Sequence, residues 1–341
     1  MPANLSPEYT AAEAAFRKAR EPRERLECLR EMLRTIPKHK GTERLQADIK
    51  ARIKDLGEEL EGGGHRGGAR GGPALVIRPE GAAQVALLGA PNAGKSSLHA
   101  RLTGSNAHVA EYPFTTQHPE PGMMPHEDVS FQLVDLPALS PEHAVPWLAG
   151  ALQTADAAFL VVDLGEPDCL ERVRAIEALL ARKRITLTER WPCGGGEAGA
   201  PSADDDPFAI GLPTLLLANK ADAIPGLAQE LQAFLELSGL RLPAKVVSAA
   251  TGQGLGELGP WLFARLGIVR AYTKAPGHAP DKTRPYAIRQ GQTVADVARL
   301  IHKDIEKSLR FARVWGPSSH DGQHVGPDHV LADGDVVELH A

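Results

Sequence analysis

The residue pattern with the clearest chemical meaning is a glycine-rich loop of the form G-x-x-x-x-G-K-S, which follows an apolar run and precedes a helical run. In that context the backbone N–H groups of the loop and the positive end of the helix can hold phosphate oxygens. The lysine would bridge the β- and γ-phosphates of a nucleotide, and the serine hydroxyl would bind Mg²⁺. A chance glycine-rich turn is the alternative, which the flanking runs disfavour. The predicted phosphate-binding residues are Gly89, Ala90, Pro91, Asn92, Ala93, Gly94, Lys95, Ser96 and the adjacent Ser97.

Two later segments carry oxygen atoms suited to the same metal ion. Residues 112–116 read Tyr-Pro-Phe-Thr-Thr, a loop in which Thr116 could present its hydroxyl beside the γ-phosphate. Asp135 follows the apolar run 131–134, where its carboxylate could hold Mg²⁺ through a water molecule. We therefore predict Ser96, Thr116 and Asp135 as the magnesium site.

Two further segments predict which base the nucleotide carries. In Asn219-Lys220-Ala221-Asp222, the aspartate could accept hydrogen bonds from N1–H and the exocyclic amine of guanine. Adenine offers neither donor at those positions, and a buried carboxylate left unpaired costs about 1–3 kcal/mol. The segment 248–250 could turn a backbone N–H toward the guanine oxygen. The sequence therefore predicts GTP rather than ATP, bound at its base by Asn219, Lys220, Asp222, Ser248, Ala249 and Ala250.

Loops with these roles need a rigid sheet to hold them, and the sequence predicts one between residues 74 and 268. Apolar runs alternate there with longer helical patterns, and their continuous hydrophobicity is typical of strands buried on both faces of a mostly parallel sheet. A segment without periodicity at 184–211 is predicted to be a surface loop. The predicted strands are 84–88, 131–134, 158–162, 214–217 and 245–247.

The flanking regions differ in character from this α/β domain. Residues 1–60 contain two apolar stripes at helical spacing, which predict a helical hairpin, and the glycine-rich residues 61–73 predict a linker. Residues 269–341 predict a small α+β domain with a helix capped by Thr293 and Asp296. Its predicted strands are 286–288, 311–315 and 336–339. Trp315, beside Phe311, is expected in the core.

Composition limits the classes of partner. Lys and Arg number 38 against 43 Asp and Glu, so the chain is not a wholly basic nucleic-acid binder, and we expect no DNA partner. We find no signal peptide and no apolar run long enough to span a membrane, so we expect a cytoplasmic protein without a membrane partner. The basic N-terminal residues could contact a phosphate backbone or form only a solvated face; they are Arg34, Lys38, Lys40, Arg44, Lys50, Arg52 and Lys54.

Taken together, these motifs resemble the G motifs of the TRAFAC GTPases, in particular the Obg-related group and its DRG branch (developmentally regulated GTP-binding proteins). The segment 37–43 resembles the N-terminal helical region of that branch, and 112–116 resembles its switch I loop. Segments of the C-terminal region resemble a TGS domain, a ubiquitin-like β-grasp module. The resemblance implies an α/β fold: a P-loop NTPase G domain between an N-terminal helical hairpin and a C-terminal TGS domain. The TGS-like segments are 269–274, 301–304, 314–316 and 325–331.

The resemblance also implies an activity. Asn92 stands where potassium-activated relatives have an asparagine near the phosphates, and Leu139 stands where Ras-like enzymes have a water-orienting glutamine. We therefore expect slow, Mg²⁺-dependent GTP hydrolysis, stimulated by K⁺ and dependent on Lys95, Thr116 and Asn92, in a protein that engages the ribosome or structured RNA. Ala138 replaces the glycine of switch II and puts nucleotide-dependent switching in doubt. The alternative is a nucleotide-bound scaffold with a vestigial switch that recruits partners through the TGS domain.

Overall fold

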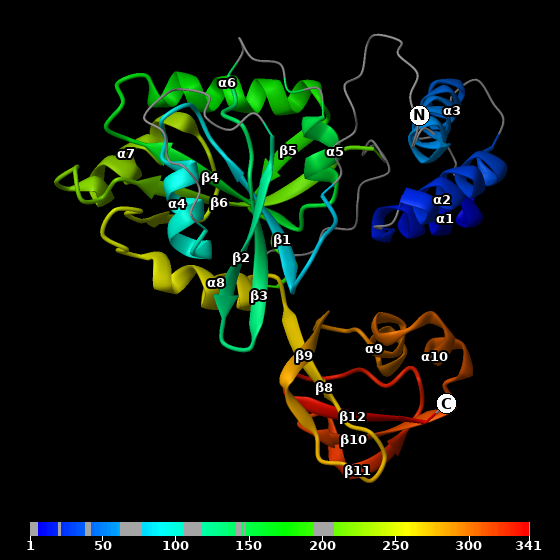
Figure 1. The fold of residues 1–341 in the computed structure, drawn as a ribbon. Coiled ribbons are helices and arrows are strands. Elements are labelled where there is room, and N and C mark those ends of the chain that lie inside the picture. Colours follow the sequence, from blue (N-terminus) through cyan, green and yellow to red (C-terminus); the bar gives the residue numbers. More distant parts are fainter. Residues whose placement is uncertain are drawn as a thin grey trace. The chain divides into compact units, whose positions relative to one another are not determined.

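A computed structural model of the protein describes residues 6–19, 22–37, 42–61, 77–105, 118–140, 145, 147–193 and 208–340. Figure 1 shows the fold of these residues. By their contacts they divide into two compact units. The first contains the N-terminal helices with 147–154 and 208–209, and the second contains the other described residues. No helix in the described part of the chain combines the length and apolarity needed to cross a membrane. Beyond Glu61, the predicted linker at 61–73 lies outside the described residues.

The first unit contains the helices α1 (Pro7–Lys18), α2 (Pro22–Thr35), α3 (Glu43–Glu61) and α5 (Leu148–Gln153). The apolar side chains of α1, α2 and α3 share one core. Phe208, which is distant in sequence, packs edge-to-face on Phe16 with ring centroids 5.9 Å apart. The core side chains, all nearly inaccessible to solvent, include Tyr9, Phe16, Leu29, Met32 and Ile49.

The N-terminal region departs from the predicted two-helix hairpin, because α1 precedes α2 and α3 as a further helix. The side-chain oxygen of Ser6 caps α1 by accepting a hydrogen bond from the backbone N–H of Tyr9 at 3.1 Å. The same hydroxyl donates to the carbonyl of Thr35 at 3.1 Å, which ties the start of α1 to the end of α2. Alanines occupy positions 11, 12, 14 and 15, so the apolar stripe of α1 is weak in the sequence.

The second unit contains a seven-stranded sheet with the order β2-β3-β1-β4-β6-β5, and β7 also pairs with β6. Only the β2–β3 pair is antiparallel among these strands, so the prediction of a mostly parallel sheet is confirmed. The strands are β1 (Ala83–Leu88), β2 (Glu120–His126), β3 (Val129–Asp135), β4 (Ala157–Asp163), β5 (Ile185–Thr188), β6 (Ile210–Asn219) and β7 (Ala244–Val246).

Two of these strands were not predicted. β2 contains Pro121, Gly122 and Pro125, and it is mostly exposed at the edge of the sheet, where prolines are tolerated. β5 lies inside the segment predicted as a loop at 184–211; its four residues are too few to show a periodic pattern. The start of β6 pairs with β5 and also lies inside that segment, while residues 194–207 are outside the described part.

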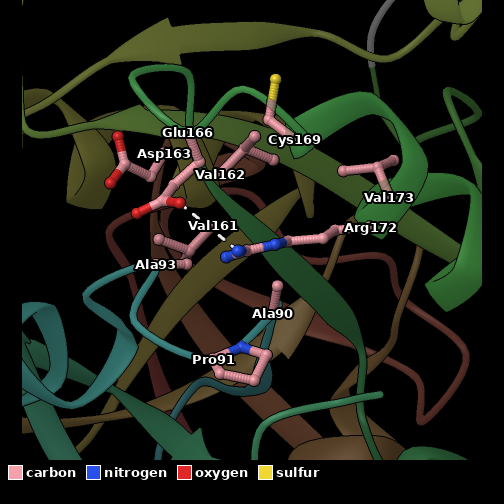
Figure 2. A pocket seen from close by; sticks show the side chains of 10 residues that line it. All are labelled: Ala90, Pro91, Ala93, Val161, Val162, Asp163, Glu166, Cys169, Arg172 and Val173. Carbon is pink, nitrogen blue, oxygen red and sulfur yellow. Dashed lines mark hydrogen bonds and ion pairs between the residues drawn. The ribbon is translucent and has the colours of Figure 1, made fainter. Parts of the chain in front are cut away.

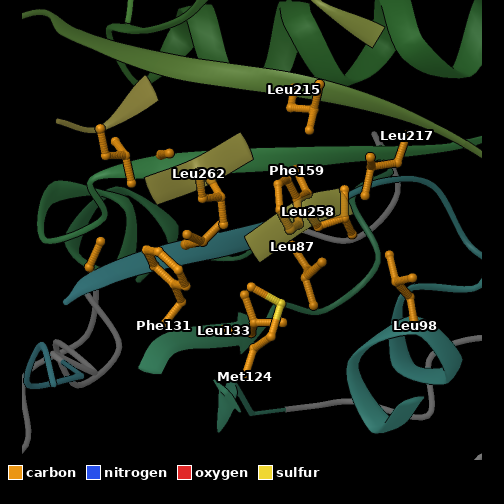
Figure 3. Close-up of a cluster of buried hydrophobic side chains, with 14 of the residues drawn as sticks. Leu87, Leu98, Met124, Phe131, Leu133, Phe159, Leu215, Leu217, Leu258 and Leu262 are labelled. Carbon is orange, nitrogen blue, oxygen red and sulfur yellow. The ribbon is translucent and has the colours of Figure 1, made fainter. Parts of the chain in front are cut away.

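The core of this sheet is formed by side chains from its central strands and from the helices that cover it. The helical elements are α4 (Lys95–Thr103), α6 (Cys169–Arg182), α7 (Leu227–Ser238), the short 3₁₀ helix η1 (Leu255–Glu257) and α8 (Leu258–Arg265). Figure 3 shows Leu87, Phe131 and Phe159 of the strands gathered with Leu258 and Leu262 of α8. This rigid centre fixes the strand ends from which the functional loops emerge.

A second, five-stranded sheet follows in the same unit, with the order β11-β10-β12-β8-β9. Its β8 and β12 are parallel and its other pairs are antiparallel. The side chains of Thr293 and Asp296 form the predicted capping box at the start of its helix. Its elements are β8 (Ile268–Thr273), β9 (Asp281–Arg289), α9 (Val294–Ile301), α10 (Lys303–Ser308), β10 (Phe311–Gly316), β11 (Ser319–Val325) and β12 (Asp335–His340).

Trp315 does not lie in the core of this domain, contrary to the prediction, and neither does its neighbour Phe311. Along β10, the buried residues are Ala312 and Val314, and residues 311, 313 and 315 alternate with them on the opposite face of the sheet. The ring of Phe311 stacks between His324 and His340, at centroid distances of 4.1 and 4.4 Å. Trp315 was predicted as core because the short run 311–315 did not reveal which of its alternating positions face inward.

Candidate functional site

Several of the predicted nucleotide-binding residues lie at the carboxyl ends of parallel strands in one sheet. The phosphate-binding loop follows β1, Asp135 is the last residue of β3, and Asn219 is the last residue of β6. Leu87 is in register with Asp135, and Asp163 at the end of β4 is in register with Asn219. Ligands of open α/β sheets bind at this edge, so the fold brings the candidate residues to a suitable place.

The loop between β1 and α4 has a backbone that requires glycine at Gly94. This residue has a φ of 89°, and a Cβ atom there would collide with the side-chain nitrogen of Asn219. Gly94 is also the N-cap of α4, and it provides no side-chain hydrogen bond to the first turn. The loop therefore runs close to β6 and leads into a helix whose first N–H groups lack a side-chain cap, as a phosphate site requires.

Lys95 is folded over this loop rather than extended into solvent. Its side chain is almost completely buried, and Nζ donates a hydrogen bond to the carbonyl of Ala90 at 3.3 Å. Burial lowers the pKa of Lys95, and the nearby negative charge of Asp135 opposes this shift. Phosphate oxygens in the loop would favour the charged ammonium further, because they would supply the counter-charges that burial removes from water.

Ser96 and Asp135 form an oxygen pair that fits a magnesium ion. The Ser96 hydroxyl donates a hydrogen bond to a carboxylate oxygen of Asp135 at 2.6 Å, and Asp135 is 1% exposed. Mg²⁺ prefers oxygen ligands and usually keeps several waters, so one hydroxyl and one carboxylate beside a phosphate are an appropriate set. The ion, when bound, would neutralise phosphate charge. The third predicted ligand, Thr116, lies outside the described residues, as does the rest of 112–116.

Asn219 connects the phosphate-binding loop to the segment predicted to read the base. It is 1% exposed, and its side-chain N–H donates to the carbonyl of Ala93 at 3.0 Å. Its side-chain oxygen accepts a hydrogen bond from the backbone N–H of Ala249 at 3.1 Å. A single buried amide therefore fixes the distance between the two halves of the candidate site.

The remaining base-site residues lie beside this amide. The carboxylate of Asp222 is at the surface and accepts a hydrogen bond from the Ser248 hydroxyl at 2.5 Å. Ser248 is completely buried, whereas Ala250 is exposed. The backbone N–H of Ala221 donates to the carbonyl of Val247 at 3.1 Å, which holds the two segments together. The structure thus brings the two predicted base-binding segments into direct contact.

The predicted set did not include Asp163, although this residue contacts it. An oxygen of the Asp163 carboxylate lies 2.6 Å from Nζ of Lys220. The available signal was positional: Asp163 ends the buried run 158–162, just as Asp135 and Asn219 end their own strands. Asp163 belongs to none of the motifs recognised in the sequence.

A small pocket, partly open to solvent, lies between the phosphate-binding loop and α6. Its lining includes Ala90, Pro91 and Ala93 of the loop together with residues of β4 and α6. Figure 2 shows Arg172 crossing it, with its guanidinium 3.3 Å from a carboxylate oxygen of Glu166. Among its lining residues, only those of the loop belong to the predicted nucleotide ligands.

The segment after Asp135 is tied to the phosphate-binding loop. The backbone N–H of Leu139 donates to the carbonyl of Gly89 at 3.1 Å, and the Leu139 side chain is 2% exposed. Ala138, before it, is half-buried. The side chain at position 139 therefore packs into the protein and has no polar atom with which to orient water.

Sequence comparisons relate the chain to known GTP-binding proteins. A family model described as "50S ribosome-binding GTPase" matches residues 84–189, and a model of the TGS domain matches residues 269–341. The chain is 30% identical to an uncharacterized GTP-binding protein of Halobacterium salinarum, over 93% of this chain and 98% of the relative. It is 27% identical to "Ribosome-interacting GTPase 1" of Saccharomyces cerevisiae, over 93% of this chain and 98% of that protein. It is 29% identical to "Developmentally-regulated GTP-binding protein 1 homolog" of Dictyostelium discoideum, over 91% and 96% of the two chains.

Proposed function

The chain belongs to the DRG branch of the Obg-related GTPases, and we propose that this GTP-binding protein is a regulatory GTPase with slow hydrolysis that engages the ribosome or structured RNA. The observation that supports the proposal most strongly is the convergence at the sheet edge. Lys95, Ser96 and Asp135 lie together there, and Asn219 joins their loop to the base-reading segment. We further propose the domain division 1–60, 61–73, 74–268 and 269–341.

In this proposal each residue has a defined part in holding Mg-GTP. Lys95 neutralises phosphate charge, and Ser96, Thr116 and Asp135 hold the magnesium ion. Asp222 accepts hydrogen bonds from guanine, and its contact with Ser248 at 2.5 Å supports a fixed orientation for that carboxylate.

In this proposal, hydrolysis is slow because of the residue at position 139. The buried, apolar Leu139 cannot orient an attacking water, so the stabilisation must come from elsewhere. We propose that K⁺ supplies it beside Asn92. This residue has a φ of 61° and is exposed within the phosphate-binding loop, so its side-chain oxygen is accessible to a cation.

Engagement of the ribosome is supported by the names of a relative and of the matching family, and less by the N-terminal basic residues. Arg34 pairs with Glu31 at 2.5 Å, and the guanidinium of Arg52 lies over the ring of Phe208, so both are engaged within their own unit. The contacts that bind ribosomal RNA would then have to come from other parts of the chain as well.

Sedimentation with purified ribosomal particles tests this part of the proposal. The wild-type protein should sediment with the particles in a nonhydrolysable GTP analogue and less in GDP. Lys95→Met, which removes the phosphate-binding ammonium, should sediment equally weakly in both. Sedimentation that is independent of nucleotide would favour the scaffold, and no sedimentation would refute ribosome engagement.

The scaffold remains a second candidate because one observation favours it. The hydrogen bond from Leu139 to Gly89 holds the segment after Asp135 against the loop, and Ala138 lacks the backbone freedom of the usual glycine. A segment so held would respond weakly to the γ-phosphate. Hydrolysis measurements separate the two candidates, because a GTPase hydrolyses its bound GTP and the scaffold retains it.

A further inference from the structure

Asp163 is a buried carboxylate outside the predicted motifs. It ends β4, it is 8% exposed, and Figure 2 shows it at the rim of the pocket beside the phosphate-binding loop. One of its oxygens lies 2.6 Å from Nζ of Lys220, and the other accepts a hydrogen bond from the backbone N–H of Gly165 at 3.0 Å. The orientation of its carboxylate is therefore fixed, and its negative charge is paired with Lys220 of the base-reading segment.

Lys220 begins the turn that carries Asp222. Its φ of 64° is a left-handed conformation, which residues with a side chain disfavour. The next residue, Ala221, is tied to the carbonyl of Val247 at 3.1 Å, and Asp222 then accepts the hydroxyl of Ser248 at 2.5 Å. The ion pair with Asp163 restrains the first residue of this turn, and the bonds to 247 and 248 restrain the rest.

We propose that Asp163 is a positioning residue for guanine recognition. The side chain of Lys220 is 40% exposed, and a flexible four-carbon stem in water has no fixed direction of its own. Asp163 ties the ammonium back to the end of β4, which keeps the stem and the left-handed turn in place and so aligns Asp222 with the base. Lys95 has a separate partner in Ala90, so the effect falls on base recognition rather than on phosphate binding.

Asp163→Asn tests this role because it keeps the shape of the side chain and removes its charge. Asp168→Asn is a matched control, since Asp168 lies after the same strand and pairs instead with Arg172 at 2.8 Å. Dissociation constants would be measured for GTP and for ITP. The base of ITP lacks the exocyclic amine from which Asp222 would accept a hydrogen bond. Asp163→Asn should weaken GTP binding by about three- to tenfold and lower the preference for GTP over ITP by a similar factor.

Lys220→Met completes a double-mutant cycle. If the two residues act as one unit, the double variant should bind GTP no more weakly than the weaker single variant. An unchanged GTP-to-ITP ratio in Asp163→Asn, or additive losses in the cycle, would overturn the proposal even if the variant is less stable. The proposal rests on guanine binding by the wild type, which the same titration measures directly.

A second inference comes from Arg270, whose guanidinium is surrounded by carboxylates. Its Nε and Nη2 donate to the two oxygens of Asp333 at 3.0 and 2.7 Å. Its Nη1 donates to Glu127 at 2.6 Å and to Asp128 at 3.0 Å. The Tyr272 hydroxyl also donates to Asp128. Arg270 and Tyr272 lie on β8, while Glu127 and Asp128 form the turn between β2 and β3.

The β2–β3 hairpin connects this cluster to the metal site. Its strands are paired without a break from Glu120 opposite Asp135 to His126 opposite Val129, which at the usual rise per residue is roughly 20 Å. At one end Asp135 contacts Ser96, and at the other end the turn contacts Arg270. A change at the nucleotide end can therefore reach β8 through one rigid element.

We infer that the contact of Arg270 with this hairpin carries the nucleotide state from the metal site to the β-grasp domain. The inference rests on the proposed switching. Backbone hydrogen exchange of the β-grasp strands β9 and β12 would be compared in GDP and in a nonhydrolysable GTP analogue. Variants would be Arg270→Met and the milder Asp128→Asn, with Arg299→Met as control, because Arg299 pairs with Glu306 inside the β-grasp domain at 2.6 Å.

The wild type and Arg299→Met should show a nucleotide-dependent difference in exchange, and the other two variants should lose it. A difference that survives in Arg270→Met and Asp128→Asn would overturn the inference. The inference would also be overturned if, in the wild type, hydrogen exchange at Glu120 and Asp135 depended on the nucleotide while exchange in β9 and β12 did not. If neither the hairpin nor the β-grasp strands respond, the proposed switch fails and this inference fails with it.

Discussion

Replacement of Asn219 by alanine should disconnect the two halves of the nucleotide site. The side chain of Asn219 makes two hydrogen bonds to backbone groups, one with the carbonyl of Ala93 and one with the N–H of Ala249. Each bond contributes about 1 kcal/mol net, and backbone groups left unpaired in a buried setting cost about 1–3 kcal/mol. Because Ala249 is only half-buried, we take the lower part of this range for the two groups. Their total of about 2–4 kcal/mol corresponds to a loss of roughly 30- to 1,000-fold in GTP affinity.

The assay is a titration with a fluorescent GDP analogue, with GTP as competitor, together with thermal unfolding of the nucleotide-free protein. Gly94→Ala provides an independent route to the same loss, since its Cβ would displace the Asn219 amide. Gln232→Ala is the matched control, because it removes an exposed side-chain amide that bonds only to Glu236 among the described residues. A loss of less than threefold in both Asn219→Ala and Gly94→Ala would refute the reasoning that this amide organises the site.

Three other outcomes are expected. Ser96→Ala should bind GTP with little dependence on Mg²⁺, measured by titration with and without a chelator, whereas an unchanged dependence would remove Ser96 from the metal site. Asp222→Asn should weaken GTP binding and favour xanthosine triphosphate, and equal losses for both nucleotides would contradict the role of Asp222 in base selection. Burial alone would raise the pKa values of Asp128 and Asp333, but hydrogen bonds, mainly from Tyr272 and Arg270 to Asp128 and from Arg270 to Asp333, hold both below their ordinary value. These carboxylates stabilise the fold above about pH 4 and lose that contribution as the pH falls further. Arg270→Met should therefore lower the urea midpoint of unfolding at pH 7, and its midpoint should fall less between about pH 5 and pH 3 than that of the wild type. Midpoints that fall in parallel in the wild type and the variant would be inconsistent with this linkage.

The sequence predicted the strands that matter for the site because they are buried on both faces. The runs ending at Leu88, Val134, Val162 and Leu217 are continuous and apolar, so their positions and the residues that follow them could be recognised. β2 could not be recognised in the same way, because an exposed edge strand with prolines lacks both continuous and alternating hydrophobicity.

What the sequence could not predict were contacts between residues far apart in the chain. The partner of Lys220 is Asp163, and the partners of Arg270 include Glu127 and Asp128. A single sequence gives the type of each side chain but not which of many opposite charges it meets, since that depends on strand order. Trp315 illustrates the same limit, because its alternation with buried neighbours becomes visible only when the sheet is known.

Single-turnover hydrolysis of bound GTP, in K⁺ and in Na⁺ at equal ionic strength, tests the central claim most directly. We predict slow hydrolysis in K⁺, slower hydrolysis in Na⁺, and loss of the difference in Asn92→Ala with GTP binding retained. Absence of hydrolysis in both salts, with GTP bound throughout, would contradict the proposed GTPase and leave the nucleotide as a structural ligand of a scaffold.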